Sequence, residues 1–345
     1  MNPSTLKDKI YGSLLGVAAG DAMGMPSSLL APEEINRLFP DGIHDFLPAP
    51  EGHLIHDKMV AGQVTDDTQQ TLLLVDLFLE TGGFTAESTA HKLIKWAESI
   101  NAFDGLFLGP SSLRALKMIK EGYPITETGR LGDTNGASMR IAAVGLANPG
   151  ELNSTITDTA EVCKPTHNTN IAIAGAAGVA CAISAAVNGA DMNQLIEAFF
   201  YGVDKGMQRG EHWTGASIQY RSEWALKLVR SGKREKEIWS NLYNYIGTGV
   251  ATTEAVPSAI ALVAYYEGDP WKVITAAANI GGDCDTVGAI AGGISGAFAG
   301  VNAFPKSVPD TIDSVNNLDL ESYASRITER VSQAKHQSIS IKESI

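Results

Sequence analysis

Residues 6–26 of this 345-residue chain read LKDKIYGSLLGVAAGDAMGMP. Apolar residues recur in this stretch at helical spacing, which predicts a helix over Leu6–Ala19 that ends in the glycines before Pro26. Glycines four residues apart would give the helix one smooth face: Gly12, Gly16 and Gly20. Asp21 is then expected near the C-terminal end, where a negative charge opposes the helix macrodipole. A carboxylate in that position is a candidate functional group, and a plain turn residue is the alternative.

Two later stretches are also rich in small residues. Residues 171–187 and 287–301 consist largely of Ala, Gly and aliphatic side chains. Ala and Gly contribute little to membrane insertion, and both runs are shorter than the roughly 20 residues that a spanning helix needs. Small side chains do allow helix backbones to approach closely. We therefore expect two buried, tightly packed helices and no membrane partner.

The rest of the chain has helical periodicity and almost no strand signal. No sustained period-two alternation, internal repeat or low-complexity linker is found. Residues 27–63, which include several prolines, are expected to form a long irregular loop of the kind that often binds ligands. Further helices are predicted over residues 67–81, 85–98, 109–122, 133–146, 192–201, 218–229, 235–245, 256–266, 271–278, from 285 onward, and over 320–331. The sequence predicts a single all-α domain over residues 1–345.

Composition and charge limit the classes of function. Hydrophobic residues make up 44% and charged residues 19% of the chain, an ordinary balance for a soluble protein. The formal net charge of −13 argues against nucleic acid or an anionic membrane as the main partner. The three cysteines form no CxxC pair, and the first residues lack the apolar segment of a signal peptide. We therefore expect a cytoplasmic protein.

Two clusters of acidic and hydroxyl side chains each precede an apolar helix. They are Thr65-Asp66-Asp67 and Asp283-Cys284-Asp285-Thr286. Either cluster could serve as a helix N-cap, and Asp66 with Gln69 has the spacing of a capping box. A cap needs one acceptor, however, whereas each cluster offers three oxygen-bearing side chains, which would be costly to desolvate together without a cation. The two clusters predict a site for Mg²⁺, Mn²⁺ or Ca²⁺, because zinc would be expected to recruit Cys or His.

Other polar residues are weaker candidates on their own. Asn135-Gly136 at a predicted helix start would suit an anion, with Gly132 giving a phosphate more room, and a plain cap is the alternative. Arg140 could pair with a phosphate or with an internal carboxylate. His167 could contact a substrate or be an ordinary hydrogen-bonded histidine.

Histidines and aromatic residues elsewhere carry structural expectations. His53 and His56 lie in the proline-containing loop without a third nitrogen or sulfur ligand nearby, so we expect exposed loop histidines. Four aromatic residues could line a pocket, but at helical spacing we expect them to fill the core: Trp213, Tyr220, Trp224 and Trp239.

Taken in chain order, these motifs resemble those of the ADP-ribosylglycohydrolases. The matching segments are Gly20-Asp21-Ala22, Thr65-Asp66-Asp67-Thr68, Asn135-Gly136-Ala137 with Met139-Arg140, Pro165-Thr166-His167, and Gly282-Asp283-Cys284-Asp285-Thr286. The resemblance extends from about residue 6 to residue 299. It implies a single-domain orthogonal multi-helix bundle with a core over about 6–300, followed by a C-terminal helical extension over 301–345.

The resemblance also implies a binuclear metal site and a hydrolytic reaction. Two divalent cations, Mg²⁺ or Mn²⁺, would be coordinated by Thr65, Asp66, Asp67, Asp283, Asp285 and Thr286. The implied substrate-binding residues are Asp21, Asn135, Gly136, Ala137, Met139 and His167, with the Asn135-Gly136 turn holding the diphosphate of ADP-ribose. Asp283 or Asp67 is the candidate carboxylate that activates water at the ribosyl anomeric carbon.

One position departs from the family pattern. Ser28 stands where many members carry a glutamate on a loop over the site, and Glu33 and Glu34 follow shortly after it. We therefore carry three functions forward. The first is metal-dependent glycosidic hydrolysis of an ADP-ribosylated substrate, small or protein-linked; the second is hydrolysis of a nucleoside or other small ribosyl compound in the same site. The third is non-catalytic binding of ADP-ribose.

Overall fold

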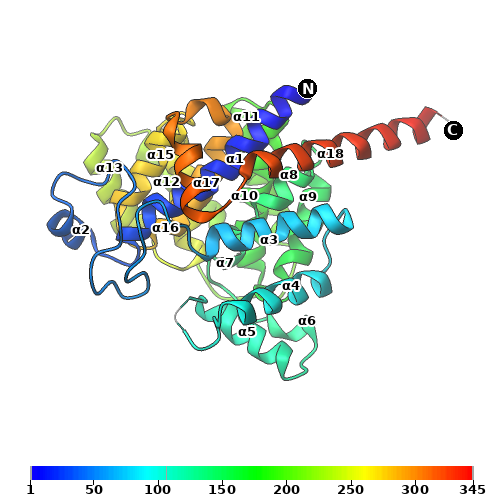
Figure 1. The fold of residues 1–345 in the computed structure, drawn as a ribbon, viewed down its shortest axis with the longest axis horizontal. Coiled ribbons are helices and arrows are strands. Elements are labelled where there is room, and N and C mark those ends of the chain that lie inside the picture. The colour runs from blue at the N-terminus through cyan, green and yellow to red at the C-terminus, as the bar shows by residue number, and fades with distance from the viewer. Residues whose placement is uncertain (1, 106, 344–345) are drawn as a thin grey trace.

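The structure, a computed structural model, describes residues 2–105 and 107–343, with side chains as far as Ala334. In this part of the chain all the regular secondary structure is helical, with isolated β-bridges but no strand, so the prediction of an all-α fold is confirmed (Figure 1). The α-helices are α1 (Pro3–Gly24), α2 (Pro32–Leu38), α3 (Asp66–Thr81), α4 (Ala86–Ser99), α5 (Pro110–Lys120), α6 (Ile125–Thr128), α7 (Gly136–Met139), α8 (Ala142–Ala147), α9 (Leu152–Cys163), α10 (Asn170–Val187), α11 (Met192–Gly206), α12 (Ile218–Val229), α13 (Glu235–Asn241), α14 (Thr252–Tyr265), α15 (Pro270–Ile280), α16 (Cys284–Ala299), α17 (Ser307–Asn316) and α18 (Leu320–Glu343). Short helical segments are η1 (Met25–Ser27), η2 (Leu242–Ile246) and η3 (Val301–Ala303).

Helices α1 and α16 pack against each other at the centre of the molecule. Their glycines face one another, and the contact is so close that a Cβ on Gly16 would overlap the carbonyl oxygen of Gly292, and the reverse. The two helices therefore touch backbone to backbone, as the small-residue faces predicted. This contact places the end of α1 beside the start of α16, where the second acidic cluster lies.

Helix α10 is the other small-residue helix, and it is a core element. By length and composition it could cross a membrane, but 94% of its most apolar window is buried inside the protein. Such burial is expected of a helix in the core of a protein. The helix is capped at its N-terminus by Thr169, whose side chain accepts a hydrogen bond from the backbone N–H of Ala172.

The C-terminal helices continue the same hydrophobic core. Leu320, Ala324 and Ile327 on α18 are buried in the cluster that also contains the apolar face of α1. The far end of α18 projects away from the body of the protein in Figure 1. The expected extension over residues 301–345 is thus partly built into the bundle.

The helix predicted over residues 133–146 is interrupted. The structure has two short helices there, α7 and α8, separated at Arg140 and Ile141. Arg140 is fully buried, and its guanidinium donates to Gln70 Oε1 at 2.6 Å and to Thr166 Oγ1 at 2.7 Å. The prediction of one continuous helix was wrong because a buried turn is as apolar as a buried helix, so the sequence pattern shows no break.

Three helices lie outside the predicted ranges: α2, α6 and α9. Helix α2 starts with Pro32 in its first turn, where proline fits a helix, although in the sequence it resembled a loop residue. Helix α9 is rich in threonine and carries few large apolar side chains, so its periodicity is weak.

Two of the four aromatic residues assigned to the core lie on the surface. Tyr220 and Trp224, one turn apart on α12, are 75% and 53% exposed. Trp213 and Trp239 are partly buried against the core. Helical spacing places residues on one face, but it does not say which face is turned inward.

Candidate metal and substrate site

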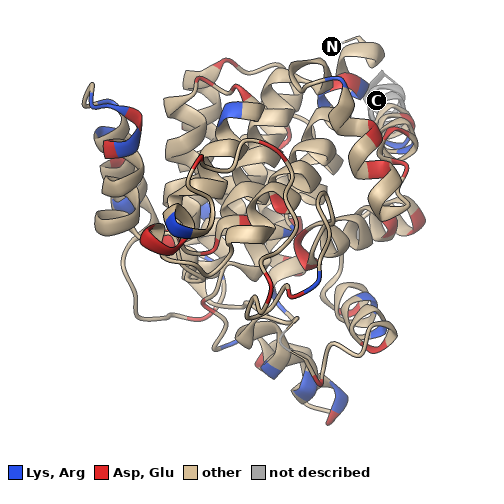
Figure 2. Cartoon of the chain, turned by 60° about the vertical axis from the view of Figure 1, so that its left-hand side comes forward, with Lys and Arg blue, Asp and Glu red and all other residues tan. Residues whose placement is uncertain are grey.

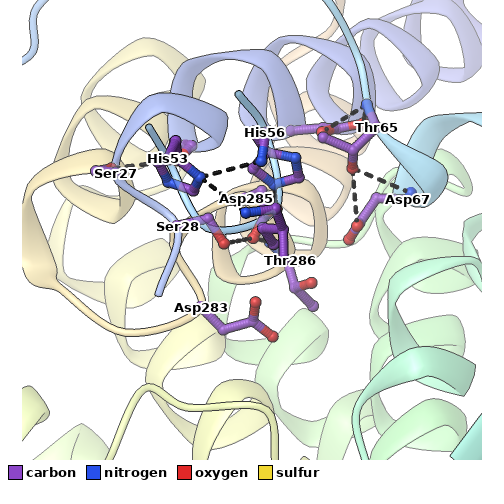
Figure 3. A network of polar contacts seen from close by, with 12 residues as sticks. Ser27, Ser28, His53, His56, Thr65, Asp67, Asp283, Asp285 and Thr286 are labelled. Carbon is purple, nitrogen blue, oxygen red and sulfur yellow. Dashed lines mark hydrogen bonds and ion pairs between the residues drawn. The ribbon is translucent and has the colours of Figure 1, made fainter. Parts of the chain in front are cut away.

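One cavity of about 410 Å³ receives both acidic clusters. The start of α3 contributes Asp66 and Asp67, and the start of α16 contributes Asp283, Asp285 and Thr286. Figure 3 shows Asp67 across from Asp283 and Thr286. The fold therefore brings together two clusters that are far apart in the sequence.

The first cluster is organised by two side chains that do not line the cavity. Thr65 is the N-cap of α3, and its hydroxyl donates to Asp67 Oδ2 at 3.2 Å. Asp21, in the last turn of α1, accepts from the backbone N–H groups of Thr65 at 2.9 Å and Thr68 at 3.1 Å and from the Thr68 hydroxyl at 2.5 Å. Asp21 is completely buried, so it holds the start of α3 in place from behind.

Asp66 is held by a short chain of hydrogen bonds. Gln70 Nε2 donates to Asp66 Oδ2 at 2.9 Å, and Gln70 Oε1 accepts from Arg140 Nη1 at 2.6 Å. Because arginine can only donate, the orientation of the Gln70 amide is fixed. The positive charge of Arg140 thus lies behind the carboxylates without entering the cavity.

The second cluster is held by residues from three other segments. Asp283 is the N-cap of α16, and its Oδ2 accepts from Asn135 Nδ2 at 2.6 Å. Asp285 lies between Ser28, whose hydroxyl donates to Oδ1 at 2.6 Å, and His56, whose Nε2 is 2.9 Å from Oδ2 (Figure 3). Both oxygens of Asp285 therefore have protein partners.

Burial and mutual repulsion set the protonation of the carboxyl groups. Burial raises the pKa of Asp66 to about 7, helped by the charges of Asp285 and Asp21. Burial also raises the pKa values of Asp67 and Asp283 well above the ordinary range, and neighbouring carboxylates add to both. Asp285 differs, because the hydrogen bonds from His56 and Ser28 and the charge of His56 outweigh burial and lower its pKa to about 2.

The donor set fits a hard divalent cation by its chemistry. Within the described residues, no three His, Cys, Asp or Glu side chains already converge closely enough to enclose a metal ion. The cavity does gather four carboxylates and a hydroxyl, the oxygen donors that Mg²⁺ and Mn²⁺ prefer. Asp67 Oδ1 is also buried with no hydrogen-bond partner, which leaves one oxygen free for a ligand.

The expectation that His53 and His56 are exposed was wrong. Their exposures are 7% and 5%, and the two rings stack with centroids 5.2 Å apart. His56 lines the cavity beside Asp285, and His53 Nδ1 accepts from the backbone N–H of His56 at 3.1 Å. Nothing in the sequence indicated that His56 is buried, because its partner Asp285 lies on α16, 229 residues away along the chain.

The Asn135-Gly136 turn reaches the cavity, but several of its groups already have partners. The Asn135 N–H donates to the carbonyl of Val250 at 2.9 Å, and α7 is only one turn long. A Cβ on Gly132 would overlap the backbone of Thr166, and one on Gly136 would press on the ring of His167. The two glycines thus allow the segment containing Thr166 and His167 to pack against the turn.

The remaining candidate substrate residues divide between the cavity wall and the layer behind it. Met139 lines the cavity, whereas Ala137 and His167 are fully buried and do not. His167 Nε2 lies 3.0 Å from Thr134 Oγ1, and burial lowers its pKa well below the usual value, with the charge of Arg140 adding to the effect. His167 is therefore a neutral histidine that supports the turn.

Ser28 is pinned in place beside the cavity. The next residue, Leu29, donates its N–H to the Gly282 carbonyl at 2.6 Å, and Gly282 donates to Leu30 at 2.9 Å. Glu33 and Glu34 are exposed on α2 and do not line this cavity, so neither replaces the family's glutamate in this structure.

Sequence reasoning missed the apolar part of the site. Leu29, Leu54, Phe107 and Val250 line the cavity and are among the exposed large hydrophobic residues. They come from four separate loops, so no periodic pattern relates them. The only sign of them in the sequence is that each is a large apolar residue in a segment that was expected to be a loop.

The fold and the acidic cavity define an all-helical protein with an oxygen-rich site at two helix starts. The sequence profile of the family described as ADP-ribosylglycohydrolase matches residues 2–337. The chain belongs to the ADP-ribosylglycohydrolase family, as its motifs predicted.

Individual relatives agree with this assignment. The uncharacterized protein YegU of Escherichia coli (strain K12) is 37% identical over 322 residues, which cover 93% of this chain and 96% of that protein. The ADP-ribosylarginine hydrolase Tri1 of Pseudomonas putida (strain GB-1) is 25% identical over 331 residues, covering 91% of this chain and 76% of that protein. A solved structure titled ADP-ribosylglycohydrolase-related protein complex has a TM-score of 0.70 at 23% identity, covering 95% of this chain and 99% of that one. That structure supports the fold.

Proposed function

We propose that this protein is a divalent-metal-dependent hydrolase that cleaves a glycosidic bond at the anomeric carbon of a ribosyl group. The family supports a glycosidic hydrolase. The observation that carries the finer proposal is the gathering of Asp66, Asp67, Asp283 and Asp285 in one cavity. Three buried carboxylates and a partly buried one that repel one another have little structural use without a cation to neutralise them.

The proposed cofactors are two Mg²⁺ or Mn²⁺ ions, held by the oxygens of the two clusters. The ligand residues would be Asp66, Asp67, Asp283, Asp285 and Thr286, which line the cavity, whereas Thr65, the sixth residue of the two clusters, does not line it. When bound, the ions would supply positive charge that orients the ribose hydroxyls and stabilises developing negative charge. Thr65 differs from the others because its hydroxyl is turned toward Asp67, so its contribution is to orient that carboxylate.

Asp283 and Asp67 are the candidate bases for the attacking water. Both side chains line the cavity, as a general base for the attacking water must. Asn135 orients Asp283, whose Oδ2 accepts from its amide, and Thr65 does the same for Asp67. The proton leaves the water as its oxygen bonds to the anomeric carbon, and the bond to the leaving group breaks.

ADP-ribosylated compounds are the first substrates to test, because the relative Tri1 is named as an ADP-ribosylarginine hydrolase. A nucleoside is the second candidate, and one observation favours it: among the described residues of the cavity wall, none is Lys or Arg. A phosphate-bearing substrate would ordinarily meet such a residue. A non-catalytic ADP-ribose binder is the third candidate.

The test is a substrate panel with purified, chelator-treated protein, with and without added Mg²⁺ or Mn²⁺. It contains ADP-ribosyl-arginine, ADP-ribosyl-serine, O-acetyl-ADP-ribose and several nucleosides, with products identified by mass spectrometry. Metal-restored cleavage that Asp283→Asn abolishes and Glu33→Gln preserves supports the proposal, since Glu33 is an exposed acid outside the cavity. Cleavage that is the same with and without metal would refute it. Tight ADP-ribose binding with no cleavage would favour the third candidate.

A further inference from the structure

We propose that the start of α5 binds a phosphate group of the substrate, and that Ser112 selects ribosyl compounds that carry one. This inference rests on the proposed function, because it assumes that the ribosyl group lies at the acidic clusters. It assigns a phosphate-binding part to another segment of the same cavity wall.

The N-terminus of α5 opens onto the cavity and has no side-chain cap. Gly109, Pro110 and Ser112 line the cavity, and Gly109 has no side chain that could accept from the helix. The first backbone hydrogen bond into the helix runs from the N–H of Leu113 to the Gly109 carbonyl at 3.0 Å. The N–H groups of Ser111 and Ser112 precede it, so they have no acceptor within the helix. Free N–H groups at the positive end of a helix macrodipole favour an anion.

The side chain of Ser112 is an independent indication of a ligand. The residue is only 4% exposed, yet it lines the cavity. Within the part of the chain that the structure describes, its hydroxyl takes part in no hydrogen bond. A buried hydroxyl ordinarily has a partner, so one that is unpartnered on a cavity wall indicates that a ligand supplies it. Ser112 can thus add a third donor to the two N–H groups.

The Ser112 hydroxyl also lies close to the Asn135-Gly136 turn. A Cβ on Gly136 would lie 3.5 Å from Ser112 Oγ and 3.0 Å from Cε1 of His167. The start of α5 is therefore next to this turn and to the buried layer behind it, which contains His167.

Two arginines make this buried layer positive. Nε and Nη2 of Arg114 are buried and have no hydrogen-bond partner, and Arg140 donates to the uncharged side chains of Gln70 and Thr166. Burial lowers the pKa of His167, and the charges of Arg140 and Arg114 lower it further, so both charges act on this layer. Neither arginine lines the cavity, but both can favour an anion bound at the wall in front of them.

The cavity wall thus combines two kinds of group, and a phosphorylated ribosyl compound has the matching parts. Its ribose hydroxyls suit the cations proposed at the four aspartates, and its phosphate suits the helix start. Cations at the aspartates would also remove the repulsion that these carboxylates exert on a phosphate. Elsewhere, Lys and Arg lie largely on outlying helices (Figure 2), so positive charge behind this wall is a particular feature of the site.

The first experiment measures binding. Calorimetry of the unmodified protein with excess Mg²⁺ compares ribose 5-phosphate with ribose and includes ADP-ribose. None of these compounds carries a leaving group on its free anomeric carbon, so turnover at that carbon does not interfere. We expect ribose 5-phosphate to bind at least about tenfold more tightly than ribose, and ADP-ribose at least as tightly as ribose 5-phosphate. A protein that shows no preference for the phosphate overturns the inference.

Two variants of Ser112 separate the helix start from the proposed cations, which would also attract a phosphate. Ser112→Ala removes one donor and should weaken ADP-ribose binding by about tenfold. Ser112→Asp should abolish the preference for ribose 5-phosphate over ribose, because a carboxylate in the first turn favours the helix but repels a phosphate. Ser222→Ala is the matched control, since Ser222 is also buried without a hydrogen-bond partner but lies on α12, away from the cavity. Unchanged ADP-ribose binding in both Ser112 variants overturns the assignment.

Arg114→Met tests the positive layer. Because Nε and Nη2 of Arg114 have no partner to lose, the melting temperature should not fall, whereas ADP-ribose binding should weaken by about fivefold. Arg209→Met is the control, because Arg209 is exposed and does not line the cavity. A lower melting temperature with unchanged ADP-ribose affinity would assign Arg114 a structural role and would contradict its part in phosphate binding.

Turnover by the unmodified protein separates this inference from the proposed function. Metal-dependent cleavage of ADP-ribosyl-arginine with a KM that Ser112→Ala raises supports both. Metal-dependent cleavage by a protein that shows no preference for phosphate-bearing compounds supports the proposed function and overturns the inference. Phosphate-selective binding that depends on Ser112, with no cleavage of any ribosyl compound, overturns the proposed function, while the phosphate site at α5 stands.

Discussion

The hydroxyl of Ser28 donates a hydrogen bond of 2.6 Å to Oδ1 of Asp285. Ser28 is completely buried, and His56 lies 2.9 Å from the other oxygen of the same carboxylate. The position where many family members carry a glutamate therefore holds a residue that orients a proposed metal ligand.

Removing this hydroxyl should weaken metal binding. Ser28→Ala leaves Asp285 Oδ1 without its side-chain donor, and loss of such a supporting contact typically lowers metal affinity by about 10-fold or more. Calorimetric titration of the chelator-treated protein with Mn²⁺ measures the change. Ser99→Ala is the control, because Ser99 is exposed and its hydroxyl bonds only locally to the Trp96 carbonyl. An affinity equal to that of the unmodified protein would show that Ser28 plays no part in orienting Asp285.

The sequence was sufficient to predict which acidic residues meet, but not how they are held. Asp66, Asp67, Asp283 and Asp285 carry a recognisable spacing, and the fold places all four on one cavity. Their supports come from distant segments, such as Ser28 and Asn135, and depend on tertiary contacts that no local pattern records. The apolar residues of the cavity wall, such as Leu54 and Phe107, were missed for the same reason.

Helices were predictable where the apolar pattern continues over several turns, whereas a short break inside a buried stretch was not. The helix over Ile218–Val229 has its predicted bounds, because its apolar residues recur on one side. The break at Arg140 was missed because the residues around it are all buried. The exposure of Trp224 was also missed, because the sequence does not show which face of its helix packs against other helices.

The amide of Gln70 should matter for both stability and metal binding. Gln70→Leu leaves Arg140 Nη1 without its acceptor and Asp66 Oδ2 without its donor. An unsatisfied buried polar group costs about 1–3 kcal/mol, and more when it is charged. Urea unfolding measures the loss, and Gln219→Leu is the control, because Gln219 is exposed on α12 and bonds only to Glu223. A free energy of unfolding as high as that of the control would contradict the role of Gln70 as the link between Arg140 and Asp66.

Adding a single methyl group at a glycine in the contact between α1 and α16 should destabilise the protein. A Cβ on Gly16 would overlap the backbone of Gly292, and a rigid backbone cannot move aside as a flexible side chain could. Gly16→Ala is therefore expected to lower the free energy of unfolding by about 1–3 kcal/mol or more. Thermal unfolding measures the effect. Gly83→Ala provides the control, because nothing lies within 4 Å of a Cβ there. Equal melting temperatures for the two variants would mean that the helices can separate without cost.

His167 should make the protein less stable in mild acid. Burial and the nearby charge of Arg140 lower its pKa well below the usual value, so the folded protein keeps this imidazole neutral. The unfolded chain takes up a proton as the pH falls below about 6.5, and the folded protein does not, so stability is present above that pH and is lost below it. One such group contributes a slope of up to about 1.4 kcal/mol per pH unit.

The comparison is urea unfolding of the unmodified protein and of His167→Gln at intervals from pH 8 to pH 5. Glutamine can still bond to Thr134, which lies 3.0 Å from the ring, but it does not titrate. We expect the variant to be less stable at pH 8, because packing against Gly136 is altered, and to lose less stability than the unmodified protein between pH 7 and pH 5. His91→Gln is the control, because His91 is exposed on α4. Parallel curves for the unmodified protein and His167→Gln would place the acid sensitivity elsewhere and would contradict a neutral, buried His167.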